Sequence, residues 1–256
     1  MILFSTDLET TGLDRLTDRP IEVGGILYST GQRRVLESSG YLVKSDGVPV
    51  SPKITSLTGI TQVALDKYGY EPKDALESWL DLANQADAIV GQNIKRFDKP
   101  FFENWCKRHG LVAPNKLYID TRTDLPGVEG KHLGYMAADA GFLNLFPHSA
   151  LSDCQTVLKL IEMHDINKVV ERAQSPEVVM IAHQKFENNA DAKALKFGWN
   201  GDYKIWYRIT KQLDVDMIVK AAENPNIAID NGERVPQPFN ISFAGPEISI
   251  EKLMYS

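Results

Sequence analysis

The sequence predicts an α/β protein, in which a mixed sheet with flanking helices is followed by a small C-terminal α+β appendage. Three observations lead to this fold class. Strand-like runs come first, short apolar strands then alternate with helical patterns, and the composition changes beyond about residue 175.

The expected elements follow one another in a consistent order. Strand-like runs at about 2–9, 21–30 and 34–44 precede the first convincing helix, which favours an antiparallel or mixed three-stranded start. Next comes a helix over 74–83, where Leu76, Trp79, Leu80 and Ala83 form one apolar stripe. Four elements then alternate: a strand at 88–90, a helix over 99–108 ended by Gly110, a strand at 117–120, and a helix over 131–140 closed by Gly141.

A long helix beginning near Ser149 closes the first domain. Its apolar face comprises Leu151, Cys154, Val157, Leu158 and Ile161, which places Asp153 in the first turn or two. We therefore expect one domain over 1–178 and a second over 179–256. The second contains a segment rich in Asn, Lys and aromatics at 188–211 and a Pro/Asn-rich tail over 224–240.

Composition limits the possible functions. The 256 residues carry a net charge of -6, so binding to nucleic acid would need a local basic patch or bound metal. The two cysteines, Cys106 and Cys154, fit small core positions in a reducing compartment, and we expect a cytoplasmic protein with no membrane partner and no secretion signal. Phosphate-loop, zinc-protease and serine-hydrolase motifs are absent.

Two carboxylates lie inside the first predicted strand. Asp7 and Glu9 are two residues apart, so their side chains share one face and could bind one ion together. An uncompensated charge in an apolar strand is unfavourable by several kcal/mol, which favours a metal site. The alternative is the solvated face of an edge strand.

Asp98 follows the strand at 88–90 and begins a helix. Its simplest role is a helix N-cap with Pro100 in the first turn, but three cations surround it and could face a phosphodiester backbone. Phe97, Phe101 and Phe102 are expected mainly in the core. The cations are Lys95, Arg96 and Lys99.

His148 and Asp153 complete a characteristic set. Considered alone, they would be a surface histidine and a solvated helix charge. In order after Asp7, Glu9 and Asp98, however, they closely resemble the DEDDh branch of the DnaQ-like 3′-to-5′ exonuclease superfamily. The segment Asp7-Leu8-Glu9-Thr10-Thr11-Gly12 matches that family's D-x-E-T-T-G motif, and His148 with Asp153 matches H-x-x-x-x-D.

The resemblance covers about residues 1–170 and implies a ribonuclease H-like sheet. The segment over 54–61, which contains Gly-Ile-Thr, also looks like one that borders the terminal nucleotide in the family. Asn93 stands five residues before Asp98, a spacing more like exonuclease I, and Asp18-Arg19-Pro20 is similar to a segment of that enzyme. The segment over 148–154 is closer to exonuclease X, so the subfamily stays open.

The resemblance also implies the site's chemistry. It implies two divalent cations, Mg²⁺ or Mn²⁺, held by Asp7, Glu9, Asp98 and Asp153, with His148 as general base and a nucleoside 5′-monophosphate as product. The expected substrate is a DNA 3′ end, with a separate polymerase or repair complex as partner. The candidates for contact with the terminal nucleotide are Thr10, Thr11, Gly12, Leu13, Ile60, Asn93 and Phe101.

Two alternatives stay open at this point. The motifs do not report on the 2′-hydroxyl, so an RNA-processing member of the same superfamily fits them too. A binding module that has lost catalysis fits less well, because retaining all five residues has no packing purpose. In the C-terminal region, Asn200-Gly201 lies between aromatic runs and predicts a hairpin, which serves either nucleic-acid stacking or a small core.

Overall fold

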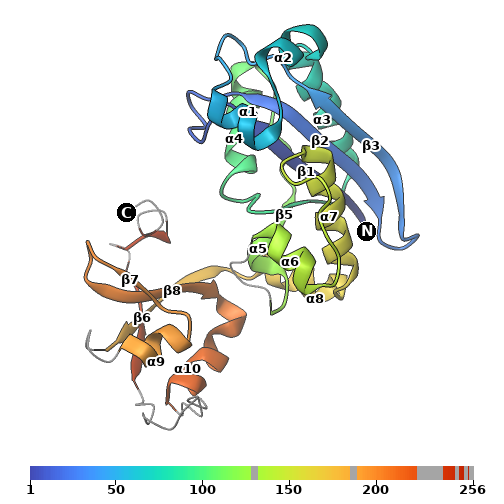
Figure 1. Ribbon diagram of the computed structural model, residues 1–256. Coiled ribbons are helices and arrows are strands. Elements are labelled where there is room, and N and C mark those ends of the chain that lie inside the picture. Colours follow the sequence, from blue (N-terminus) through green and yellow to red (C-terminus); the bar gives the residue numbers. More distant parts are fainter. Residues whose placement is uncertain (128–131, 185–188, 224–238, 246–247, 251–252, 254–256) are drawn as a thin grey trace. The chain divides into compact units, whose positions relative to one another are not determined.

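The computed structural model describes the chain except for residues 128–131, 185–188, 224–238, 246–247, 251–252 and 254–256 (Figure 1). It divides into two compact units, Met1–Gln174 and Ser175–Ser256. The division falls just before strand β6 (Glu177–His183), so the predicted boundary at 178 lies inside that strand. Within the described part of the chain, no helix is long and apolar enough to cross a membrane.

The first unit is built on a five-stranded mixed sheet in the order β3-β2-β1-β4-β5. The three-stranded start is antiparallel throughout, whereas β4 and β5 run parallel to β1. The predicted α/β class is therefore confirmed, as are all five predicted strands to within about two residues. The strands are β1 (Ile2–Thr10), β2 (Pro20–Ser29), β3 (Arg34–Leu42), β4 (Ala88–Gly91) and β5 (Leu117–Asp120).

Helices cover both faces of this sheet because side chains alternate along β1. Phe4 and Leu8 belong to the core beneath α3 (Pro72–Gln85) and α4 (Asp98–Arg108). Leu3 points to the opposite core, which contains side chains of α6 (Leu133–Asp139), α7 (Ala150–Glu162) and α8 (Ile166–Gln174). Residues 3, 5, 7 and 9 of β1 thus share the α7 face.

The remaining helices of the first unit are short. The predicted helix over 131–140 begins at Leu133, Lys131 lies outside the described residues, and Gly141 ends the helix with a φ of +82°. Gly59, with a φ of +76°, ends one short helix, and Thr61 caps the next. These helices are α1 (Pro52–Thr58), α2 (Gln62–Tyr68) and α5 (Thr121–Asp124).

The second unit contains a four-stranded sheet in the order β7-β8-β6-β9. Its core includes Phe197 and Trp206. The predicted hairpin is present, since Trp199 of β7 pairs with Trp206 of β8, but residues 201–204 form the turn, and the Asn200 side chain accepts a hydrogen bond from the Tyr203 N–H. Most of the tail predicted over 224–240 lies outside the described residues. The elements are β7 (Gly198–Asn200), β8 (Ile205–Lys211), β9 (Asn240–Phe243), α9 (Asn189–Ala194), a 3₁₀ turn (Gln212–Asp214) and α10 (Val215–Glu223).

Candidate active site

Asp7 and Glu9 lie on a central strand. Because β1 is flanked by β2 and β4, the edge-strand alternative is wrong. On the same face, the Ser5 hydroxyl donates to the backbone carbonyl of Cys154 in α7, at 3.0 Å, which brings this face of β1 against that helix. The register pairs Ser5 with Val90 near the end of β4, so β1 carries both carboxylates beyond the end of its parallel neighbour.

Asp98 is hydrogen-bonded to β1 as well as to its own backbone N–H at the start of α4. It is the first residue of α4, and the N-cap position belongs to Phe97, so the predicted N-cap role is wrong. Pro100 lies in the first turn as predicted. The Asp98 Oδ1 accepts the Leu8 backbone N–H at 3.1 Å, and the residue is 2% exposed. This bond fixes the start of α4 beside the two strand carboxylates.

Asp153 and His148 come from the first turn of α7 and the loop before it. The His148 backbone is left-handed, with a φ of +62°, and its N–H donates to Asp153 Oδ2 at 3.3 Å. Ligand-type atoms of Glu9, His148 and Asp153 all lie within 4.8 Å of one another. The structure therefore brings together residues that are far apart in the sequence.

Burial, and after it the repulsion between neighbouring acids, disfavours the charged forms of these carboxylates. Burial, and then the charges of Asp98, Asp153, Glu9 and Glu22, raise the pKa of Asp7 well above its ordinary value. Burial, followed by Asp153 and Glu22, raises the pKa of Glu9 to about 8. Burial also raises the pKa values of Asp98 and Asp153. Such a cluster favours protonation or bound cations.

Glu22 also lies at the site, although it was not among the residues predicted from the sequence. This β2 residue pairs with Glu9, and its Oε2 accepts the backbone N–H of Ala150 at 3.0 Å. Ser149, the N-cap residue of α7, makes no side-chain cap, so Glu22 caps that helix from the sheet. Gly24 permits the contact, because a Cβ there would lie 2.5 Å from the carbonyl carbon of Ala150. A carboxylate inside a predicted apolar strand was the available signal.

Asn144 was also missed. Its side-chain amide donates to Asp153 Oδ1, and its own oxygen accepts the Ser152 hydroxyl at 2.8 Å. Together with the His148 N–H, this bond holds both oxygens of the Asp153 carboxylate. No sequence signal distinguishes Asn144 from an ordinary loop asparagine.

The turn after β1 is held rigidly. The Thr10 hydroxyl donates to the carbonyl of Gly12 at 2.5 Å, and the Thr11 hydroxyl donates to Asp18 Oδ1 at 2.9 Å. Leu13 follows with 84% of its surface exposed. The turn therefore offers one projecting apolar side chain four residues after Glu9.

The other three predicted contact residues are placed differently. Ile60 is buried with Ile21 and Leu65, and Phe101 is 1% exposed in the core. Asn93 has a φ of +56°, and its backbone N–H donates to Asp120 Oδ1 at 2.8 Å.

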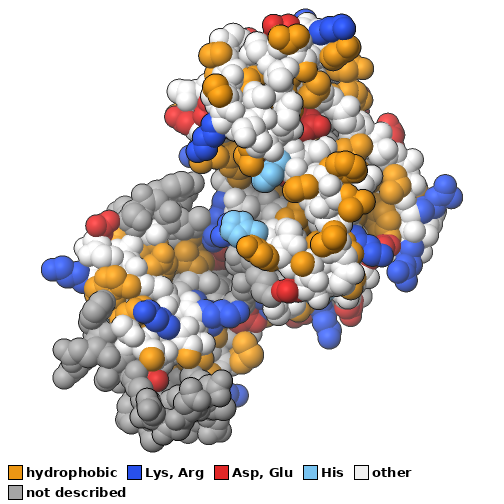
Figure 2. Space-filling view, in the orientation of Figure 1, with side chains coloured by type: hydrophobic (Ala, Val, Ile, Leu, Met, Phe, Trp, Pro, Cys, Tyr) orange, Lys and Arg blue, Asp and Glu red, His pale blue; other side chains and the backbone are white. Residues whose placement is uncertain are grey.

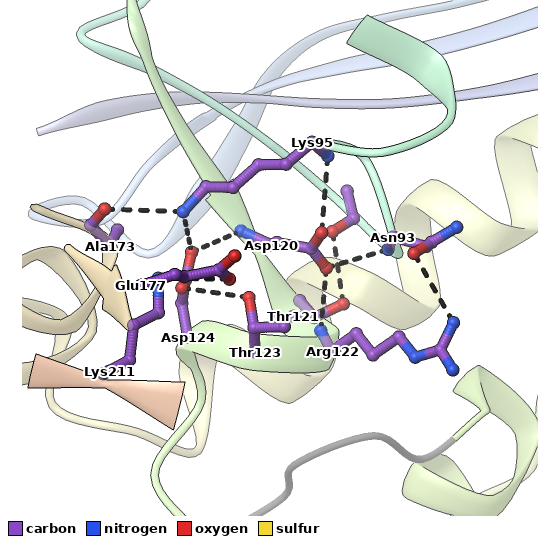
Figure 3. Close-up of polar contacts among 11 residues, drawn as sticks. Asn93, Lys95, Asp120, Thr121, Arg122, Thr123, Asp124, Ala173, Glu177 and Lys211 are labelled. Atoms are coloured by element: carbon purple, nitrogen blue, oxygen red, sulfur yellow. Dashed lines mark hydrogen bonds and ion pairs between the residues drawn. The ribbon is translucent and has the colours of Figure 1, made fainter. Parts of the chain in front are cut away.

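The predicted phosphate-facing cations are engaged elsewhere. Lys95 Nζ binds Asp124 at 2.8 Å and the carbonyl of Ala173 at 3.4 Å (Figure 3). Lys99 pairs with Glu103 on its own helix. The Lys95 contacts contradict the expectation that this side chain faces a phosphodiester backbone, whereas the Lys99 pair is exposed and leaves that expectation untested.

A ribonuclease H-like sheet with converging carboxylates at the ends of its central strands is the architecture of a class of nucleic-acid hydrolases. The family model described as exonuclease (RNase T) matches residues 4–161. The chain belongs to this exonuclease family, and its predicted place in the DnaQ-like DEDDh superfamily is confirmed.

The chain is also similar to part of several PolC-type DNA polymerases. DNA polymerase III PolC-type of Thermotoga maritima is 30% identical over 166 residues, which cover 61% of this chain and 12% of the relative. The PolC-type polymerase of Pediococcus pentosaceus is 26% identical over 230 residues, 80% of this chain and 15% of the relative. The chain thus spans a small part of the length of these relatives.

Solved structures share the fold. The nuclease domain of 3'hExo, a DEDDh family member bound to rAMP, has a TM-score of 0.53 at 18% identity and covers 63% of this chain and 90% of that domain. Escherichia coli Exonuclease I in complex with a dA16 oligonucleotide has a TM-score of 0.57 at 14% identity, with 94% of this chain and 62% of the neighbour covered.

Proposed function

We propose that the protein is a divalent-metal-dependent 3′-5′ exonuclease that releases nucleoside 5′-monophosphates from single-stranded or frayed DNA. One observation carries the proposal: Asp7, Glu9, Asp98 and Asp153 converge from three elements, with His148 beside two of them. In the described part of the chain, no hydrogen-bond donor satisfies the carboxylates of Asp7 and Glu9.

The donor set fits Mg²⁺ or Mn²⁺. All four acidic side chains offer hard oxygen ligands, which these ions prefer. Asp7, Glu9 and Asp153 would hold one ion, and Asp7 with Asp98 would hold the second. When bound, two such ions activate a water molecule and neutralise charge on the scissile phosphate.

The protein's own groups would supply the remaining steps. The exposed His148 ring, next to Glu9 and Asp153, would accept the proton of the attacking water. Asn144 and the His148 N–H hold the Asp153 carboxylate in place. The turn at Thr10 to Gly12 would meet the terminal sugar through its backbone, and Leu13 would contact the terminal base.

The preference for DNA rests on the relatives. The PolC-type relatives are named as DNA polymerases, and Exonuclease I was solved with a DNA oligonucleotide. The same likeness supports a polymerase or repair complex as partner. The cytoplasm is the proposed compartment, where the unpaired Cys106 and Cys154 would stay reduced. RNA is the second candidate, because 3'hExo was solved with rAMP bound.

Digestion of labelled substrates tests the proposal. Matched single-stranded DNA, duplex DNA and RNA, labelled at the 3′ end or the 5′ end, are incubated with Mg²⁺ or with EDTA. We expect Mg²⁺-dependent release of labelled mononucleotide from 3′-labelled single-stranded DNA and a shortening ladder from the 5′-labelled strand. Faster digestion of RNA would favour the second candidate, and the absence of any Mg²⁺-dependent product would refute both.

A further inference from the structure

The C-terminal unit carries an aromatic and basic surface that the nuclease site does not use. We define the hairpin face as Lys193, Lys196, Trp199, Tyr203 and Lys204, which lie on α9, on β7 and in the turns beside β7. All five side chains are exposed. We propose that the hairpin face binds single-stranded nucleic acid, independently of the catalytic carboxylates.

Two aromatic side chains of this face keep more than a third of their surface exposed to solvent. Phe197 and Trp206 are 3% exposed and belong to the core of the unit. Trp199, by contrast, is 40% exposed and Tyr203 is 37% exposed. Trp199 lies on β7, an edge strand of the sheet, so its ring can be reached from solvent. Exposed aromatic rings are the groups on which unpaired bases stack.

The cations are adjacent to the aromatic rings. Lys193 Nζ lies 5.9 Å from the centre of the Trp206 ring, and the Trp199 ring lies 5.4 Å from the same ring. Trp206 therefore brings Lys193 and Trp199 into one neighbourhood. Lys196 is in the same turn, because its backbone N–H donates to the carbonyl of Lys193 at 2.9 Å. Figure 2 shows blue and orange side chains close together on this unit.

Two of the lysines occupy unusual backbone positions. Lys196 has a φ of +60° and Lys204 a φ of +53°, a region in which glycine or asparagine is favoured. Cationic side chains thus occupy the two turns beside β7 despite an unfavourable backbone conformation.

The local charge matches a phosphate backbone. Residues 193–204 contain three exposed lysines and one acidic residue, Asp202, within a chain of net charge -6. A protein with this overall charge needs such a local patch to attract a polyanion. The choice of nucleic acid as occupant, rather than an acidic protein, rests partly on the proposed function.

Binding by the full chain tests the inference. Fluorescence anisotropy with labelled 20-nucleotide single-stranded DNA, single-stranded RNA and duplex DNA is measured in EDTA, which prevents hydrolysis. We expect Trp199→Ala to weaken single-strand binding roughly ten-fold and Trp199→Phe to restore most of it. Replacing Lys193, Lys196 and Lys204 with alanine is expected to make the slope of log K against log salt concentration shallower by about two, because each lost phosphate contact contributes about 0.7 to that slope.

A matched control lies in the same unit. Met217 and Lys220 on α10 are an exposed apolar residue and an exposed cation, and their double alanine variant is expected to bind like the wild type. The lysine variant keeps the core intact, so it stays informative if Trp199→Ala unfolds. The RNA arm shows whether the face also accepts ribose.

The outcomes separate this inference from the catalytic proposal. Hydrolysis of the p-nitrophenyl ester of thymidine 5′-monophosphate requires only the catalytic site, so we expect the hairpin variants to cleave it at the wild-type rate. A wild-type enzyme that cleaves neither ester nor oligonucleotide refutes the catalytic proposal, while its binding still tests the face. The inference would be overturned if Trp199→Ala and the triple lysine variant both bound single strands like the wild type. It would also be overturned if the α10 control lost as much affinity as they do, or if the wild type bound duplex DNA more tightly than single strands.

Discussion

Two buried acidic clusters lie in the first unit, and they differ in what surrounds them. The catalytic cluster contains Asp7, Glu9, Asp98 and Asp153. The second cluster contains Asp120, at the end of β5, and Asp124, which is 0% exposed. Both consist of carboxylates that are mostly buried, and only Asp7 among the six keeps intermediate exposure.

The second cluster is satisfied by the protein itself (Figure 3). Asp120 accepts backbone N–H groups of Asn93 at 2.8 Å, Arg122 at 3.0 Å and Lys95 at 3.3 Å. Asp124 accepts the Asp120 N–H at 2.7 Å and binds the Lys95 ammonium. Burial still raises the pKa of Asp120, but the three N–H groups oppose that rise.

The catalytic cluster has fewer donors for each carboxylate. Asp98 receives the Leu8 N–H, and Asp153 receives two donors, whereas among the described residues none reaches the carboxylates of Asp7 and Glu9. Buried carboxylates are unfavourable unless they are paired. The difference indicates that the second cluster stabilises the fold and that the first is arranged for cations supplied from outside.

Replacing aspartate with asparagine is expected to abolish activity but not stability in the catalytic cluster, and to lower stability but not activity in the second cluster. The loss of activity is the largest of the expected effects. Asp7→Asn removes a ligand charge at nearly constant volume, so we expect at least roughly a 10³-fold loss of Mg²⁺-dependent hydrolysis, corresponding to several kcal/mol. The fold is expected to be as stable as the wild type, or more so, because repulsion decreases. Nuclease assays and urea unfolding measure both, with the exposed Asp81→Asn as control. Near-normal digestion would refute the metal assignment.

His148 has no counterpart in the second cluster. We expect His148→Ala to slow hydrolysis by roughly 10²–10⁴ while leaving the affinity for single-stranded DNA intact, because a proton acceptor is lost and the ligands remain. The pH dependence of kcat is the decisive measurement. A variant whose profile matches that of the wild type would exclude His148 as the base.

Asp124→Asn probes the satisfied cluster. It leaves the partly buried Lys95 ammonium without its carboxylate, which is expected to lower the free energy of unfolding by about 3 kcal/mol. The folded fraction is expected to keep its hydrolytic rate. Urea unfolding and active-site titration separate the two effects. A stable but inactive Asp124→Asn would show that the clusters do not divide their roles in this way.

The pH dependence of the Tm is expected to report on the unsatisfied carboxylates of the catalytic cluster. The pKa of Glu9 rises from 4.5 to about 8 in the folded protein, so its protonated form is favoured on folding. The corresponding stability is present below about pH 4.5 and is lost as the pH rises through about 8. In EDTA we expect the Tm to fall across this range, and Mg²⁺ to oppose the fall. Glu9→Gln is expected to flatten the Mg²⁺-sensitive part of the fall in Tm with pH. A variant whose Tm falls with pH as steeply as that of the wild type would contradict the role of Glu9.

Local patterns predicted most of the fold, and the resemblance to the exonuclease superfamily singled out the five catalytic candidates. Alternation in β1 placed Asp7 and Glu9 on one face, and spacing placed Asp153 in the first turn of α7. Glu22 could not be predicted, because its role depends on a contact with Ala150, 128 residues away. Lys95 was misjudged for a similar reason: its partner Asp124 is 29 residues distant, and the sequence does not show which carboxylate a lysine will reach.

The smallest expected effect concerns Asn144, whose amide gives the catalytic cluster one of its few donors. It orients Asp153 without contacting substrate, so it is a positioning residue. Asn144→Ala is expected to lower kcat roughly ten-fold and to raise the Mg²⁺ concentration needed for half-maximal rate, as loss of an outer hydrogen bond to a ligand does. Asn144→Gln would recover part of the rate if orientation is the cause. Ser152→Ala, which removes only the hydroxyl that Asn144 accepts, would give a smaller change in the same direction. An Asn144→Ala enzyme with unaltered Mg²⁺ dependence would show that Asp153 is held by the His148 N–H and its helix alone.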